Sequence, residues 1–146
     1  QLLTKGNLDN KDRTYQCPEM ETKILQDNPS IVKSKLLQTC PAGYYKGAMV
    51  VDPGHTFHFY RQDTNGLWSH KPGTLAISTE DAKNRLIYSP EFADRMYDNP
   101  ERSNAILYTD FCGYYCIPSK KFSGTNSVKK LILSKFIFNY FFLFII

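Results

Sequence analysis

The chain has 146 residues and a formal net charge of +4 at pH 7. This length suits a single domain with a core of its own, and ten Tyr with ten Phe argue against disorder over most of the chain. Residues 1–118 carry 13 basic and 14 acidic side chains, so the positive excess comes entirely from lysines in residues 119–146. A body without a basic excess argues against a nucleic acid as partner.

The four cysteines are few for a disulfide scaffold in a chain of this length. No signal peptide is visible, and the proline of Asn28-Pro29-Ser30 excludes glycosylation there. The sequence therefore predicts free, buried cysteines and an intracellular, reducing location. Because the chain begins at Gln1 and not at methionine, we expect an upstream segment to be missing.

Short helices are predicted on either side of the central part of the chain. Pro18–Asp27 has proline at its first position and acidic residues near its start, which favours a helix. Residues 31–37 are compatible with a second short helix or with a strand. Ser89 can cap another short helix that begins at Pro90 and places Phe92 and Met96 one turn apart.

Strands are predicted between and after these helices. Residues 44–51 form an apolar run typical of a central strand, and residues 56–63 and 67–70 flank the hairpin signal Asn65-Gly66. Residues 108–118 form a last strand that Pro118 closes. The predicted fold class is α+β, a small antiparallel sheet with short flanking helices. One globular domain over residues 1–118 precedes a basic and then hydrophobic tail, residues 119–146.

The hairpin can close in two registers. A two-residue Asn65-Gly66 loop sets Arg61 opposite His70 and leaves His58 on the other face of the sheet. A three-residue loop, in which Gly66 forms a bulge, sets Tyr60 opposite His70 and brings both histidines to one face. The residues suit both turns.

The tail is apolar from Leu131 to Ile146, interrupted by Lys135 and Asn139. This stretch is short of the roughly 20 apolar residues that a spanning helix needs. Lysines that precede it suit an anchor on an anionic membrane surface. A buried terminal segment and a non-functional extension are the alternatives.

Several short motifs follow one another along the chain: CPAGYYKG (40–47), VDPG (51–54), HFYRQD (58–63), GLWSHKPG (66–73) and YTDFCG (108–113). Together they resemble an uncharacterised domain of giant DNA viruses of the mimivirus group and of some protists and bacteria. The domain is similar to papain-like thiol hydrolases of the NlpC type, which cleave amide or peptide bonds. The resemblance implies a virion or an infected cell as location, and it places the nucleophile in an upstream segment that this chain lacks. A chain without that segment is expected to be inactive.

The resemblance places a catalytic base at His58 and an orienting residue at His70 or Ser69. Cys17 is a candidate nucleophile, because it opens a predicted helix whose N-terminus lowers the pKa of a thiol. The alternative for both histidines is a structural role within a tight hairpin.

Four further residues of the hairpin are candidate ligand-binding residues. Arg61 and Asp63 share a strand face and can clamp a polar ligand or pair with each other, while Tyr60 and Trp68 can form a stacking platform or pack the sheet. Neither a cofactor nor a metal site is predicted, and Cys112 and Cys116 lie too far apart on one strand to bond to each other.

Two functions are therefore open. The first is a thiol-hydrolase-related domain, and the second is a non-catalytic module that binds a peptide or a host protein through the aromatic hairpin. The first requires His58 to border a cleft, whereas the second does not.

Overall fold

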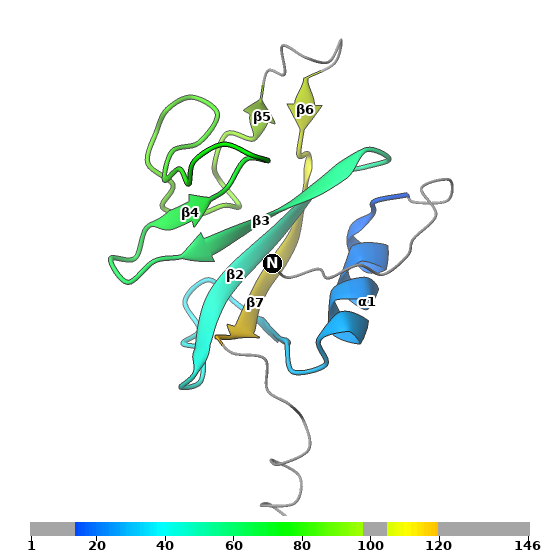
Figure 1. The fold of residues 1–146 in the computed structure, drawn as a ribbon, viewed down its shortest axis with the longest axis vertical. Coiled ribbons are helices and arrows are strands. Elements are labelled where there is room, and N and C mark those ends of the chain that lie inside the picture. The colour runs from blue at the N-terminus through cyan, green and yellow to red at the C-terminus, as the bar shows by residue number, and fades with distance from the viewer. Residues whose placement is uncertain (1–13, 98–104, 120–146) are drawn as a thin grey trace, which may run out of the picture.

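The computed structural model describes residues 14–97 and 105–119. Five antiparallel strands form the main sheet in the order β1-β7-β2-β3-β4, and β5 and β6 form a second, two-stranded sheet (Figure 1). The elements are α1 (Cys17–Asp27), β1 (Val32–Ser34), β2 (Tyr44–Asp52), β3 (Thr56–Gln62), β4 (Trp68–His70), β5 (Met96–Tyr97), β6 (Ile106–Leu107) and β7 (Asp110–Pro118).

The meander of β2, β3 and β4 confirms the three strands predicted around the hairpin. The amide of Asp63 donates to the carbonyl of Leu67 over 2.8 Å, which leaves three residues in the loop. Gly66 has a φ of +85°, a conformation that L side chains rarely adopt. Tyr60 therefore faces His70 across the strands, and the second of the two predicted registers is the one formed.

The predicted last strand is β7, and it lies between β1 and β2 although it comes last in the chain. Its register with β2 shifts at Met49/Val50 and so contains a bulge or irregularity. Gly47 of β2 pairs with Tyr115 of β7. The end of the Ile117 side chain occupies the space where a side chain at position 47 would begin, so a larger residue there would require Ile117 to move. Because side chains alternate along the strands, the two faces of the sheet are packed under two different covering layers.

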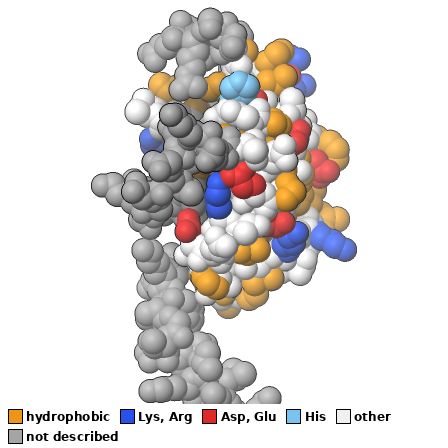
Figure 2. All heavy atoms as spheres, turned by 90° about the vertical axis from the view of Figure 1, so that its right-hand side faces the viewer, with side chains coloured by type: hydrophobic (Ala, Val, Ile, Leu, Met, Phe, Trp, Pro, Cys, Tyr) orange, Lys and Arg blue, Asp and Glu red, His pale blue; other side chains and the backbone are white. Residues whose placement is uncertain are grey.

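The first covering layer is the helix α1, which confirms the helix predicted at residues 18–27. Met20 and Ile24 are its buried residues, one helical turn apart, and they pack with Met49 and Tyr115 of the sheet. Burying two such side chains contributes about 3–6 kcal/mol before the cost of ordering is subtracted. Figure 2 views the side of the molecule that α1 lies on, where acidic and basic side chains stand close together without a large area of one sign.

The second covering layer is an irregular segment, residues 71–97, together with β6. Ile87 and Tyr108 pack with Trp68 and Tyr114 on this face of the sheet. Backbone hydrogen bonds tie the segment down, since the amide of Trp68 donates to the carbonyl of Ile87 over 2.9 Å. The segment is thus part of the fold and not a loose connection.

The predicted α+β class is wrong, because α1 is the only helix among the described residues and the rest is mainly β structure. Residues 32–34 form the strand β1, and the helix expected after Ser89 is replaced by turns and by the strand β5. The guanidinium of Arg95 explains the second difference: it donates to the carbonyls of Pro90 and Tyr108 over 2.7 and 2.9 Å. The bond to Tyr108 joins residues far apart in the chain, and the segment forms turns and the strand β5, an arrangement that local helix signals do not anticipate. A papain-like arrangement of helices beside the sheet is absent from the described residues.

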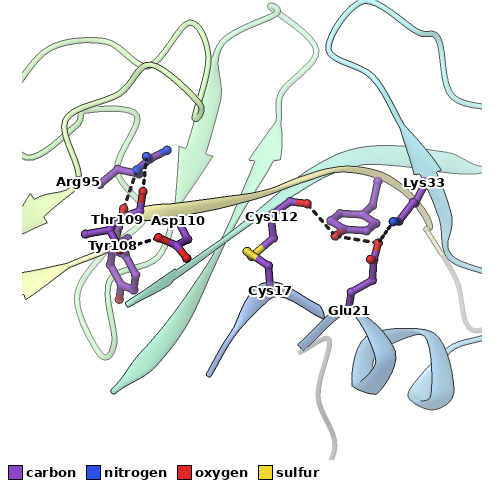
Figure 3. Close-up of a disulfide and its surroundings, with 9 residues drawn as sticks. Cys17, Glu21, Lys33, Arg95, Tyr108, Thr109, Asp110 and Cys112 are labelled. Atoms are coloured by element: carbon purple, nitrogen blue, oxygen red, sulfur yellow. Dashed lines mark hydrogen bonds and ion pairs between the residues drawn. A yellow bond between two sulfur atoms is a disulfide. The ribbon is translucent and has the colours of Figure 1, made fainter. Parts of the chain in front are cut away.

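The prediction of free cysteines is also wrong. Disulfides join Cys17 to Cys112 and Cys40 to Cys116, with Cα atoms 5.1 and 5.4 Å apart. Cys112 and Cys116 do not bond to each other, as their spacing along one strand predicted. Figure 3 shows the first bridge running from the start of α1 to β7, beside the ion pair of Glu21 and Lys33. Both bridges end on β7 and tie an N-terminal segment to it.

Candidate functional site

The two predicted histidines meet at the end of the hairpin. β3 and β4 are in register with Tyr60 opposite His70, so His58, Tyr60 and His70 project from the same face of the sheet. Tyr97 of β5 and Tyr108 close the group from the second covering layer, with the Tyr97 ring centroid 5.7 Å from that of His70 and the Tyr108 ring stacked on His58 at 5.4 Å. We call these five residues the histidine–tyrosine cluster.

The hydrogen bonds of the pair define which nitrogens carry protons. Nε2 of His70 lies 3.0 Å from the carbonyl oxygen of Glu80, and because a carbonyl only accepts, this nitrogen is the protonated one in the neutral ring. Nδ1 of His70 then offers a lone pair, and Nε2 of His58 lies 2.9 Å from it and donates. A backbone carbonyl thus orients His70, and His70 orients His58.

Burial sets the charge of this cluster. It lowers the pKa of His58 to about 4, with a smaller contribution from the neighbouring His70. Burial also lowers the pKa of His70, which the Glu80 carbonyl partly opposes. Both rings are therefore neutral at pH 7. The pKa values of the phenols of Tyr60 and Tyr97 are raised, again mainly by burial.

Two phenol groups of the cluster are buried against each other. The hydroxyls of Tyr60 and Tyr97 have no partner other than one another, and their interaction contributes to the raised pKa of Tyr60. The indole nitrogen of Trp68 is buried without a hydrogen-bond partner. Buried polar atoms without a hydrogen-bond partner are uncommon in native structures, because each costs free energy.

A cavity of about 530 Å³ opens beside the cluster. His70 and Tyr97 form part of its wall, with Ser78, Glu80 and Asp81 contributing polar groups. His58 is not among the residues that line it, because the rings of the cluster cover it. The predicted base therefore lies behind the wall of this cavity.

The candidate binding residues of the hairpin divide between the two faces of the sheet. Tyr60 and Trp68 are 2% and 0% exposed and belong to the core, so they form no accessible stacking platform. Arg61 lies on the opposite face, where its guanidinium is 4.8 Å from the ring centre of Tyr45. Asp63 accepts a hydrogen bond from the hydroxyl of Ser69 over 3.1 Å and not from Arg61. The structure thus does not bring these four residues into one site.

Cys17 lies at the start of α1, as predicted, but its sulfur is bonded to Cys112. All four cysteines are in disulfides, so the protein carries no free thiol. A disulfide sulfur cannot become a thiolate, and Cys17 in this state does not provide a nucleophile.

A second candidate site is an exposed apolar surface on the segment that covers the sheet. Its large side chains point to solvent and flank the cavity described above and a neighbouring one of about 510 Å³. We call it the apolar loop surface, and its residues with their exposed fractions are Leu75 (67%), Ile77 (71%), Leu86 (46%), Tyr88 (72%) and Phe92 (79%). Sequence reasoning missed this surface, since isolated apolar residues in a loop carry no periodic signal.

Asp81 organises this surface and was also missed. Its side chain is 4% exposed and accepts hydrogen bonds from the amides of Lys83, Arg85 and Asp94 and from the Arg85 guanidinium. These bonds hold the pKa of the carboxyl at about 2 against the opposing effect of burial. The only sequence signal was the run Ser78-Thr79-Glu80-Asp81, which is typical of many loops.

Ionic and membrane features complete the description. Residues 14–97 and 105–119 contain no group of three or more His, Cys, Asp or Glu side chains arranged to hold a metal ion. The one helix in these ranges falls short of the length and apolar character that crossing a membrane requires. The predicted membrane contact at residues 131–146 lies outside the described residues.

Comparisons with known proteins give one informative likeness. No family model matches the chain, and no solved structure matches it. Over 68 residues the chain is 46% identical to a protein of the clam Ruditapes philippinarum called "Insoluble matrix shell protein 1". The matched region is 46% of this chain and 38% of the clam protein, so the chain spans well under half of that relative's length.

This likeness contradicts the description of the chain as a giant-virus, papain-like cysteine hydrolase. The relative is an animal shell protein, and no match points to a virus or to a hydrolase. The surfaces of the fold are a better guide to function than the motifs were.

Proposed function

We propose that this chain is a non-catalytic module of an extracellular protein matrix, which associates with further copies of itself through the apolar loop surface. The observation that carries the proposal is the outward display of large apolar side chains on one segment, among them Ile77, Tyr88 and Phe92. Large exposed apolar side chains gathered on one segment of a domain are typical of a site of protein association.

The apolar loop surface is held in place and not merely loose. Ile87 points inward from the same segment and is 1% exposed, and its amide donates to the carbonyl of Thr79 over 2.9 Å. Asp81 binds three backbone amides of the segment. A surface ordered before association loses less entropy when a partner binds, which favours affinity.

The disulfides support an extracellular setting. Such bonds form and persist outside the cell and are rare in the reducing cytosol. Two bridges that use all four cysteines therefore argue against the intracellular location predicted from the sequence. The name of the clam relative, an insoluble matrix protein of shell, agrees with an extracellular material.

The hydrolase alternative lacks support among the described residues. A thiol hydrolase needs a thiolate beside its imidazole, and every cysteine of this chain is oxidised. The sequence argument also required His58 to border a cleft, whereas this side chain is packed among aromatic rings. These observations favour the binding module.

Sedimentation of the oxidised full chain over a range of concentrations tests the proposal. We expect the wild-type chain to form dimers or larger species and the triple variant Leu75→Ser, Ile77→Ser, Phe92→Ser to associate at least tenfold more weakly. Removing each exposed apolar side chain from an interface costs about 1–2 kcal/mol of association free energy, which is roughly tenfold per 1.4 kcal/mol.

Leu37→Ser is the matched control, because Leu37 is 93% exposed but lies outside the apolar loop surface. It should associate like the wild type. A wild-type chain that stays monomeric, or association of the triple variant as strong as that of the wild type, would contradict the proposal. Since all three substituted side chains are largely exposed, the variant should fold, and the near-ultraviolet circular dichroism of Trp68 checks this.

A further inference from the structure

His70 is the point at which the segment that covers the hairpin, residues 71–97, is attached to it. The backbone amide and carbonyl of His70 pair with those of Ser78, each over 2.8 Å, and its ring Nε2 donates to the carbonyl of Glu80 over 3.0 Å. Its ring Nδ1 accepts a further bond from Nε2 of His58 on β3, over 2.9 Å. One residue thus links the strand β3 to the covering segment, which carries the apolar loop surface.

The hydrogen bonds of the imidazole pair fit one pattern of protonation. In the neutral rings Nε2 of each histidine carries a proton, and the proton of His58 lies between the two rings. A further proton on His58 enters at Nδ1 and places a positive charge in the core. A further proton on His70 enters at its Nδ1, where two N–H groups would then meet head to head and the bond between the rings would be lost. Acid therefore acts against this contact through either ring.

The groups that face the pair compensate for a positive charge only in part. Neither ring forms an ion pair with a carboxylate of the described residues, and Glu80 reaches His70 through its backbone carbonyl. The three phenols of the histidine–tyrosine cluster are uncharged in acid, and their rings offset little of a buried charge. The charged side chains of the covering segment that act on these phenols are bound elsewhere: Asp81 and Asp94 to backbone amides and basic side chains, and Arg95 to backbone carbonyls.

The covering segment is bonded within itself and joined to the hairpin at few points. Its internal backbone bonds include those from Ile87 to Thr79 and from Ala82 to Asp94, and Asp81 binds three of its amides. Backbone bonds between the segment and the hairpin occur at Trp68, which donates to Ile87, and at His70. The pKa of about 2 keeps Asp81 charged in mild acid, so the internal bonds persist where the histidines take up protons. The segment can therefore separate from the hairpin as a unit.

We propose that the His58–His70 pair is a pH-sensitive latch, which holds the covering segment on the hairpin near pH 7 and releases it in mild acid while the β2–β7 ladder stays formed. Release frees the His70 ring to turn into water, which already reaches it through the cavity, and admits water to His58. The hydrated rings take up protons near their ordinary pKa of about 6.5, whereas His58 in the closed form does so only near pH 4. The open form therefore binds more protons between these values and gains population as the pH falls, and the lowered pKa of His70 acts in the same direction.

The latch also bears on association. Release of the covering segment removes the order of the apolar loop surface, so self-association should weaken in acid. This consequence rests on the proposed function, whereas the latch itself is tested on the monomeric chain.

Amide hydrogen exchange of the oxidised full chain at pH 7 and pH 4.5, at a concentration where it is monomeric, tests the latch. The amides of Trp68, His70 and Ser78 cross between the hairpin and the segment. Once the intrinsic effect of pH on exchange is removed, their protection should fall at least about tenfold, and up to about 50-fold where His58 becomes fully hydrated. The amides of the β2–β7 ladder should stay better protected at both pH values. His58→Gln keeps a donor for His70 but takes up no proton, and should lose most of the change.

His55→Gln is the matched control, because His55 is an exposed histidine whose ring contacts only the adjoining turn at Pro53 and Asp52. It should respond to acid like the wild type. Crossing amides whose protection does not change with pH, an equal change in His58→Gln, or ladder amides no better protected than the crossing ones at pH 4.5 would overturn the proposal.

A measurement on the wild type alone decides the outcome if His58→Gln does not fold, which circular dichroism checks. Nitrogen-15 resonances of the imidazoles report the charge of each ring. Both rings of the pair should become charged over the pH range in which the crossing amides lose protection. Rings that become charged while these amides stay protected would contradict the latch.

Discussion

At the scale of single residues, His58 is buried in its neutral form, whereas Asp81 is buried in its charged form. Burial lowers the pKa of His58 and leaves it neutral, with His70 as its hydrogen-bond partner. Asp81 is buried as an anion, because backbone amides and the Arg85 guanidinium offset the cost of removing its charge from water. His58 thus makes the stability of the fold sensitive to mild acid. Asp81 stays negatively charged even at a pH well below 7.

The stability of the fold should fall as the pH drops from 6.5 to 4. The pKa of His58 is about 4 in the folded chain against about 6.5 when unfolded, so in this window the unfolded state binds more protons. The loss is on the order of 2–3 kcal/mol near pH 4 and is complete only below it, and the lowered pKa of His70 adds to it with the same sign. Urea unfolding followed by the fluorescence of Trp68, the single tryptophan, measures it at pH 7 and pH 4.5.

His58→Gln should have a shallower pH dependence than the wild type in that window. The neighbouring tyrosines do not titrate there, and Asp81 and Glu19 lose their contribution mainly below this window, between their unfolded pKa values near 4 and their folded values of about 2. An equal pH dependence in the two proteins would show that the pair does not carry the effect.

Two substitutions of Asp81 distinguish the contributions of the hydrogen bonds that its two carboxylate oxygens accept. Asp81→Ala leaves the amides of Lys83, Arg85 and Asp94 without their acceptor and should cost about 2–4 kcal/mol. Asp81→Asn keeps the oxygen that accepts from Lys83 and Arg85, so its cost should be about half as large. Urea unfolding gives both values, and amide hydrogen exchange at Arg85 and Asp94 locates the loss; equal stability of all three proteins would contradict the role assigned to Asp81.

At the scale of elements, the helix and the hairpin could be predicted from the sequence, because residues close together in the chain determine them. The helix at residues 17–27 and the hairpin around Gly66 follow from capping, turn and alternation rules. The register of the hairpin could not be chosen, since Asn65-Gly66 suits both loops, and long-range bonds such as that between the backbones of His70 and Ser78 hold the strand β4. The wrongly predicted helix after Ser89 failed for the same reason, because Arg95 binds carbonyls far along the chain.

The candidate site was predicted in part. Strand alternation placed His58 and His70 on one face in only one of the two registers that the sequence left open, and the structure forms that register and brings the two rings together. Tyr97 and Tyr108 could not be assigned to the same cluster, because they lie far along the chain and arrive on β5 and after β6. The apolar loop surface was missed because exposure depends on tertiary packing and not on residue type.

At the scale of the whole molecule, two disulfides close large loops, and both end on the interior strand β7. Cys17 and Cys112 are 95 residues apart, and Cys40 and Cys116 are 76 apart. Sequence reasoning missed both bridges, since it weighed the number of cysteines against chain length and could not see which segments flank β7. The bridges compensate for a domain whose described part contains one short helix and many irregular residues.

Reduction should therefore destabilise the chain strongly. Closing loops of this size restricts the unfolded state by about 4.5 kcal/mol each on the chain-entropy account, and measured values range from about 0 to 5 kcal/mol. Urea unfolding with and without a reductant measures the change. The double variant Cys17→Ser, Cys112→Ser should lose about half of the total, and stability unchanged by reduction would contradict the structural role of the bridges.

The proposed matrix function depends on which surface of the whole molecule meets its partner. Besides the apolar loop surface, the exposed edge strand β1 presents unpaired backbone groups, and Val32 there is 52% exposed. Association through that edge would extend the sheet and leave Leu75, Ile77 and Phe92 in solvent. The two modes therefore protect different backbone amides from exchange.

Hydrogen–deuterium exchange of the oxidised full chain, compared at a concentration where it is monomeric and at one where it is associated, distinguishes them most directly. We predict that association slows exchange within residues 74–93 and leaves exchange in residues 31–35 unchanged. Slower exchange confined to residues 31–35, or no region that changes with concentration, would contradict association through the apolar loop surface.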